Sequence, residues 1–125
     1  GEMLMSKSTS PSDVLRIEVD RRGTDSAVVT LTGSANMDIA DHLQERLIDL
    51  LDQGAERLVL DLSGLKFISS VGLSAIIGAH LHCRHRLSEV RLVNPQPAIL
   101  DLLNITRLTR IFTIHDSVEQ ALSAS

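Results

Sequence analysis

The chain has 125 residues, 43% of them hydrophobic, which is enough for one globular domain with a core of its own. Its net charge of −4 and its two phenylalanines, without tryptophan or tyrosine, provide neither the basic surface nor the stacking rings that nucleic-acid binding requires. A single cysteine, Cys83, excludes an internal disulfide bond.

The amino-terminal residues 1–12 differ in composition from the rest of the chain. They are polar and rich in serine, so we expect them to be disordered, with one domain spanning residues 13–125. No apolar stretch near the amino terminus is long enough for a signal peptide or a membrane span. The expected location is therefore the cytoplasm, without direct insertion into a membrane.

Two strands are predicted at the start of the domain. In residues 14–19, apolar Leu15, Ile17 and Val19 alternate with polar side chains, and residues 27–31 form a second apolar run. Turn-forming residues 20–25 separate the two segments, so the sequence predicts an antiparallel hairpin. Residues 33–36 are then expected to form a loop.

A helix is predicted after this loop, with Asp38 as its candidate cap and Gly54 at its end. Its apolar residues are Ile39, Leu43, Leu47, Ile48, Leu50 and Leu51. Its other side carries Asp41, Gln44, Glu45 and Arg46. We interpret this second group as a solvated face.

The middle of the chain is predicted to be a strand, a loop and the start of a second helix. The strand covers residues 57–62, where a short run of branched apolar residues is typical of a strand buried on both faces. The helix starts near Ser70. Its apolar face is predicted from helical spacing to contain Leu73, Ile76, Ile77 and Leu81.

The remaining elements complete an α/β pattern. A strand at residues 90–93 follows the second helix, and this order of strand, helix and strand implies parallel pairing. Pro97 suits the first position of a short helix that reaches about Leu103. Residues 111–115 are a last short strand, and Asp116 or Ser117 caps a terminal helix at 118–122. The predicted fold is a mixed sheet of about five strands packed with about four helices.

Ser69 and Ser70 lie where the predicted loop meets the second helix. The first backbone amides of a helix lack partners and its dipole is positive there, so this position accepts negative charge. Two interpretations follow from the residues alone. A serine here caps the helix, which stabilises it by ~1 kcal/mol, or it is a phosphorylation site that gains a charge of about −1.5 to −2.

Three segments resemble one known family. Residues 61–63 read Asp-Leu-Ser, residues 67–73 read Phe-Ile-Ser-Ser-Val-Gly-Leu, and residues 31–33 read Leu-Thr-Gly. This pattern, within about residues 14–122, is similar to STAS domains, and specifically to the bacterial anti-sigma factor antagonists. Matched residue by residue, the phosphorylated serine of that family corresponds to Ser70 and its helix-opening glycine to Gly72. The family often has aspartate in place of Ser69, and an acidic Gly-Glu-Leu-Asp motif where residues 33–36 read Gly-Ser-Ala-Asn.

The resemblance implies a binding module that phosphorylation controls. Unmodified, it would bind an anti-sigma factor that is also a serine kinase, and it would release this partner once the kinase has phosphorylated Ser70. A serine phosphatase would restore the unmodified form. The residues expected to bind the partner are Asn36, Asp38, Ser69, Ser70, Val71, Gly72 and Ser74.

Two alternatives to this function remain: a non-switching STAS subunit of a membrane transport complex, and a STAS domain that senses a small ligand. Enzyme activity is not expected, because the sequence has neither a Gly-x-Ser-x-Gly elbow nor a phosphate-binding loop. Asp38 and Asp61 are expected to bond loop amides or to line the docking surface. No cofactor is expected. A metal ion is not expected either, because on a helix His82 and His85 share one face while His80 and Cys83 share another.

Overall fold

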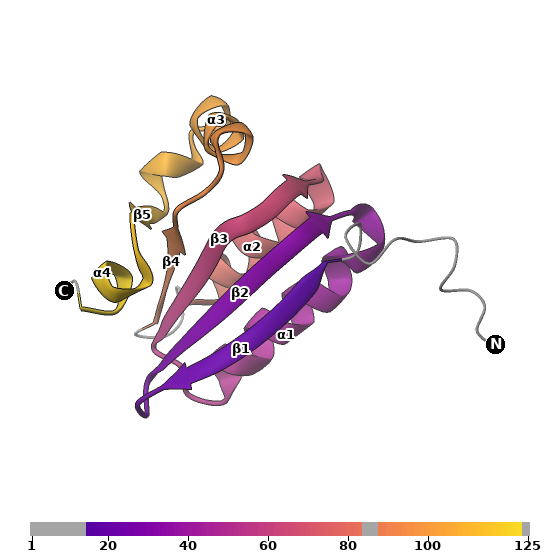
Figure 1. Cartoon of the computed structure of the whole chain (residues 1–125). Coiled ribbons are helices and arrows are strands. Elements are labelled where there is room, and N and C mark those ends of the chain that lie inside the picture. The colour runs from indigo at the N-terminus through magenta and orange to yellow at the C-terminus, as the bar shows by residue number, and fades with distance from the viewer. Residues whose placement is uncertain (1–14, 84–87, 124–125) are drawn as a thin grey trace.

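Five strands form one sheet in the order β1-β2-β3-β4-β5 in this computed structural model, which describes residues 15–83 and 88–123 (Figure 1). They are β1 (Arg16–Arg22), β2 (Ser26–Ala35), β3 (Arg57–Ile68), β4 (Glu89–Val93) and β5 (Thr113–His115). β1 pairs antiparallel with β2, and all other neighbours pair in parallel. The predicted hairpin and the predicted parallel pairing are both confirmed. The predicted disordered segment, residues 1–12, lies outside the described residues.

The described residues also form four α-helices: α1 (Ala40–Asp52), α2 (Ser70–Cys83), α3 (Pro97–Ile105) and α4 (Val118–Ser123). α1 and α2 pack side by side over one face of the sheet (Figure 1). α4 packs against the other face, where its Ala121 meets Val28, Val59 and Val93. The predicted fold class, with about five strands and about four helices, is confirmed. No helix within the described ranges is both long and apolar enough to cross a membrane.

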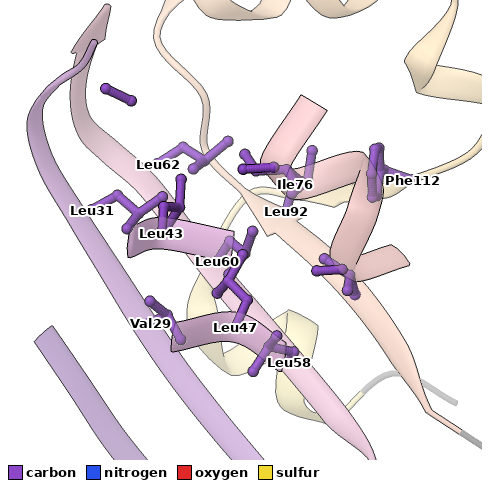
Figure 2. Packing of buried hydrophobic residues seen from close by; sticks show 14 of the residues in the cluster. Val29, Leu31, Leu43, Leu47, Leu58, Leu60, Leu62, Ile76, Leu92 and Phe112 are labelled. Atoms are coloured by element: carbon purple, nitrogen blue, oxygen red, sulfur yellow. The ribbon is translucent and has the colours of Figure 1, made fainter. Parts of the chain in front are cut away.

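The core lies between the sheet and the pair α1 and α2 (Figure 2). Alternate residues of the central strands point into it, because successive side chains of a strand point to opposite faces. Its residues include Val29, Leu31, Leu58, Leu60 and Leu62 from the sheet and Leu43, Leu47 and Ile76 from the two helices. β3 is thus buried on both faces, as predicted, since Val59 belongs to the opposite cluster.

β3 continues to Ile68, whereas the sequence predicts that it ends at residue 62 with a loop after it. β3 gains one residue relative to β2 at each of two register shifts, one after Thr30 and one after Gly33. Its buried positions change from the consecutive residues 58–60 to residues 62, 65 and 68. The strand prediction stops too early because it rests on the short apolar run, which ends at Leu62, while the pairing with β2 continues to Ile68.

β2 is also longer than predicted, because residues 33–35 belong to the strand and not to a loop. Gly33 has a φ of +103°, which glycine adopts at little cost, and it lies next to the second register shift. The strand passes this irregularity and still pairs with β3 up to Ala35, which lies opposite Ile68. As a result, β2 and β3 end together at one edge of the sheet.

Asp38 does not cap α1, contrary to the prediction. Residues 37–39 form a 3-10 turn after Asn36, α1 begins at Ala40, and no side chain caps either start.

Gln44 is not part of a fully solvated face, contrary to the prediction. It is half-buried, and its amide occupies the space that a side chain on Gly78 of α2 would need. At the carboxyl-terminal end of the domain, Pro97 begins α3 as predicted, and Ser117 is the residue that caps α4, accepting a hydrogen bond from the Gln120 amide at 3.2 Å.

The buried face of α2 differs in part from the prediction. Leu73 and Ile76 are buried, but Ile77 is only half-buried and Leu81 is 50% exposed. The face toward the sheet continues instead through Ala75, Ala79 and Cys83. Helical spacing alone predicts the wrong residues for the end of this face, because α2 carries apolar residues on every side. Only contact with the sheet determines which of them are buried.

Candidate functional site

The candidate site lies at the carboxyl edge of the sheet, where β2 and β3 end beside the start of α2 (Figure 1). Ser69 is the single residue between β3 and α2. Its amide donates a hydrogen bond to the carbonyl oxygen of Ala35, at 2.8 Å, so the end of β2 holds the junction in place. The carboxyl edge of parallel strands is also where open α/β sheets place their sites.

The two adjacent serines have different environments. Ser69 is half-buried, and its Oγ accepts a hydrogen bond from the amide of Gly72 at 3.0 Å, which makes it the cap of α2. Ser70 is the first residue of α2 and is exposed. Its carbonyl oxygen accepts a hydrogen bond from the hydroxyl of Ser74, at 3.0 Å, but within the described ranges its own hydroxyl has no partner. The capping role therefore belongs to Ser69, and the hydroxyl of Ser70 is accessible for chemistry.

Most of the residues predicted to bind a partner are surface residues on the two segments that meet here. Asn36 and Asp38 are exposed on the connection between β2 and α1, and this connection contacts α2. Val71 and Ser74 are exposed on the first turns of α2, near Ser70. The structure thus brings the two groups to the same edge of the sheet, and partner binding by them stays a prediction.

Asp61 lies farther back along β3 than the serines. Its Oδ1 accepts hydrogen bonds from the amide and the hydroxyl of Ser63, at 3.0 Å and 2.8 Å. These bonds stabilise the strand where the first register shift occurs. Asp61 therefore bonds a nearby amide, which is one of the two roles that the sequence predicts for it.

Gly72, which the sequence predicts to bind the partner, is buried and packs against the ends of β2 and β3. A Cβ atom on Gly72 would lie 3.0 Å from the carbonyl oxygen of Ala35 and 3.0 Å from Cγ1 of Ile68. The absence of a side chain lets the first turn of α2 lie close to the ends of β2 and β3. Gly72 thus allows the close packing of α2 against the sheet, and this packing positions the neighbouring Ser70.

Replacing Gly72 with valine is therefore expected to destabilise the fold, by about 1 to 3 kcal/mol, because the added methyl groups meet backbone that cannot turn away. Denaturant unfolding would measure this loss. Gly78→Ala is the control, since its Cβ would meet only the end of the flexible Gln44 side chain, and its stability should match the parent protein or exceed it. A Gly72→Val protein with an unchanged unfolding midpoint would contradict this packing.

Sequence reasoning missed two exposed apolar residues near this edge, Met37 and Phe67. Met37 is 68% exposed, Phe67 is 50% exposed and Val71, which was predicted, is 39% exposed. Large exposed apolar patches mark interaction surfaces, so these three residues are candidates for a surface that a partner covers. Phe67 lies between the buried residues Leu65 and Ile68 of β3. Its exposure can be predicted only once the register shifts of this strand are known.

The histidines of α2 have other roles. The ring of His80 lies edge-on against that of Phe112, with 5.1 Å between centroids. Nε2 of His82 lies 2.9 Å from Oδ1 of Asp52, which links α2 to α1. His85 lies outside the described residues. Within residues 15–83 and 88–123, no group of three or more histidine, cysteine, aspartate or glutamate residues is placed to hold a metal ion.

Known proteins resemble the chain in both sequence and fold. The family model of the STAS domain matches residues 16–121. BtrV of Bordetella bronchiseptica, provisionally named an anti-sigma factor antagonist, is 31% identical over 97 residues, which cover 78% of this chain and 84% of BtrV. An anti-sigma factor antagonist from Mycobacterium paratuberculosis has a solved structure with a TM-score of 0.78 and 24% identity, covering 93% of this chain and 97% of that one.

A further solved structure is that of the anti-sigma factor antagonist SpoIIAA of Bacillus. Its unphosphorylated form has a TM-score of 0.77 and 16% identity, covering 86% of this chain and 93% of SpoIIAA. Its phosphorylated form has a TM-score of 0.71 and 15% identity, with coverage of 86% and 96%. At these identities, the solved structures establish a shared fold.

Proposed function

Because the chain belongs to the STAS domain family, we propose that it is an anti-sigma factor antagonist whose binding is switched off by phosphorylation of Ser70. Unphosphorylated, it binds an anti-sigma factor that is also a serine kinase. Phosphorylated, it releases this partner, and a serine phosphatase restores it. The observation that carries the proposal is the exposed hydroxyl of Ser70 on the first turn of α2, at the edge where β2 and β3 end.

The relatives support both parts of this proposal. BtrV, with 31% identity, carries the name of an anti-sigma factor antagonist. SpoIIAA, whose fold the chain shares, is an antagonist that occurs in an unphosphorylated and a phosphorylated form. By resemblance to the family motif, Ser70 corresponds to the phosphorylated serine, and Ser70 is exposed whereas Ser69 is half-buried.

The chemistry requires little from this chain beyond a presented hydroxyl. Oγ of Ser70 attacks the γ-phosphorus of ATP, the bond from that phosphorus to the β–γ bridging oxygen breaks, and ADP leaves. The hydroxyl proton passes to a base of the kinase. ATP belongs to the kinase, since this sequence has no phosphate-binding loop.

Phosphorylation changes the charge of the docking surface more than the fold. The new phosphate adds a charge of about −1.5 to −2 at the positive end of the α2 dipole, where the helix itself tolerates it. A partner docked on the same surface must instead desolvate that charge. Exposed Met37, Phe67 and Val71 supply apolar area to this surface. A loss of about 3 kcal/mol in binding free energy corresponds to a roughly hundredfold weaker complex.

The test uses the wild-type chain and recombinant candidate kinases of the anti-sigma factor class. With ATP, the chain should gain the mass of one phosphate, mapped to Ser70, and calorimetry should then show about hundredfold weaker binding to the kinase. Treatment with a serine phosphatase should restore the affinity. Phosphorylation without loss of affinity would contradict the switch. If no candidate kinase modifies the wild type, the transport-complex subunit becomes the better assignment.

A further inference from the structure

We propose that Ser69 is the positioning residue for phosphorylation of Ser70. Its side chain holds the first turn of α2 so that the neighbouring hydroxyl faces the kinase. This inference rests on the proposed function, because it concerns how the acceptor is presented.

Ser69 is held by three hydrogen bonds. Its amide donates to the carbonyl oxygen of Ala35 at 2.8 Å, its carbonyl oxygen accepts from the amide of Leu73 at 2.9 Å, and its Oγ accepts from the amide of Gly72 at 3.0 Å. The first bond fixes the residue to the end of β2, and the other two fix it to the first turn of α2. The backbone on both sides of Ser70 is therefore positioned through Ser69.

Ser70 itself contributes nothing to this positioning through its side chain. It is exposed, and within the described part of the chain its hydroxyl has no hydrogen-bond partner. The position of the Ser70 hydroxyl thus depends on the backbone of the first helical turn. The conformation of that backbone depends on the cap that Ser69 provides.

Only one of the three bonds of Ser69 depends on its side chain. Without Oγ, the amide of Gly72 loses its partner, although Gly72 is buried against Ala35 and Ile68. An unpaired buried amide is unfavourable, so the first turn opens more often. The loss of a serine cap changes such an equilibrium by about two- to thirtyfold.

The same geometry distinguishes the two serines as acceptors. Oγ of Ser69 is directed at the amide of Gly72 and its residue is half-buried, so attack on ATP would require the cap to break. Attack by Ser70 does not require the cap to break. Ser69 thus positions the first turn of α2, and Ser70 accepts the phosphate.

The experiment compares Ser69→Ala, Ser69→Asn and Ser117→Ala with the wild type, using the kinase that phosphorylates the wild-type chain. Asparagine is as good a cap as serine and carries no charge. Ser117→Ala removes a similar cap from α4, where Ser117 Oγ accepts a hydrogen bond from the Gln120 amide at 3.2 Å. It therefore controls for the loss of stability that removal of any helix cap causes. All rates are measured well below the unfolding temperature of every variant.

For Ser69→Ala, kcat/KM for phosphorylation of Ser70 should fall about two- to thirtyfold, and hydrogen exchange of the Gly72 amide should become faster. Ser69→Asn should restore both quantities, and Ser117→Ala should change neither.

The other possible outcomes distinguish a failure of the proposed function from a failure of the positioning role of Ser69. A wild-type chain that no kinase modifies at Ser70 would remove the proposed function. Normal phosphorylation of the wild type together with an unchanged rate for Ser69→Ala would overturn the positioning role alone. The same follows if Ser69→Asn remains as slow as Ser69→Ala, or if Ser117→Ala slows the reaction equally.

Discussion

Ser70→Ala is expected to take up no phosphate and to stay bound to its kinase whether or not ATP is present. The acceptor oxygen is removed, while the cap on Ser69 and the surrounding surface are unchanged. Stability should change little, because Ser70 is exposed and alanine is favourable in a helix. Intact mass after incubation with kinase and ATP, followed by calorimetry of the same sample, measures both effects.

A matched set of variants makes this result specific. Ser69→Asn keeps the cap and should still be phosphorylated at Ser70. Ser70→Asp should weaken binding only in part, because one carboxylate carries less charge than the roughly −1.5 to −2 of a phosphate. Phosphate uptake by Ser70→Ala at the wild-type rate would show that another residue is the acceptor.

Ile76→Ala is expected to lower the free energy of unfolding by about 2 to 5 kcal/mol. Ile76 is 2% exposed and lies in the core between α2 and the sheet (Figure 2). Its truncation removes buried methyl groups and leaves a cavity that the close-packed strands fill only in part. Denaturant unfolding at one temperature gives the difference directly.

The control for this variant is Leu81→Ala on the same helix. Leu81 is 50% exposed, so its replacement should change stability by less than about 0.5 kcal/mol. The sequence places both residues on one apolar face, and the pair therefore tests the corrected face. Equal unfolding midpoints for the two variants would mean that the orientation of α2 is wrong.

Most of the fold could be predicted from local patterns. The alternation around Leu15, Ile17 and Val19 identifies β1, and the order of strand, helix and strand leads to the parallel pairing of β3 and β4. Such predictions work where one period of apolar residues continues unbroken. They fail at the ends of β2 and β3, which pair with each other across two register shifts that the apolar pattern does not reveal.

The family motif predicts Ser70 as the phosphorylated residue, but it does not say which of the two serines caps α2. Ser69 and Ser70 are adjacent, and which of them caps α2 depends on where β3 ends. That end is set by the pairing of Ala35 with Ile68 and by the hydrogen bond from Ser69 to Ala35. These contacts join segments that are far apart in the sequence.

The sequence by itself determined the α/β class, the hairpin, the parallel pairing and the serine pair at the start of a helix, because each depends on residues close together in the chain. Only the tertiary structure decided that Gly72 is buried, that Phe67 is exposed and that Leu81 faces solvent. Each of these depends on which segment packs against the residue. A side chain's burial is settled by its neighbours in space, and at this edge the neighbours come from the end of another strand.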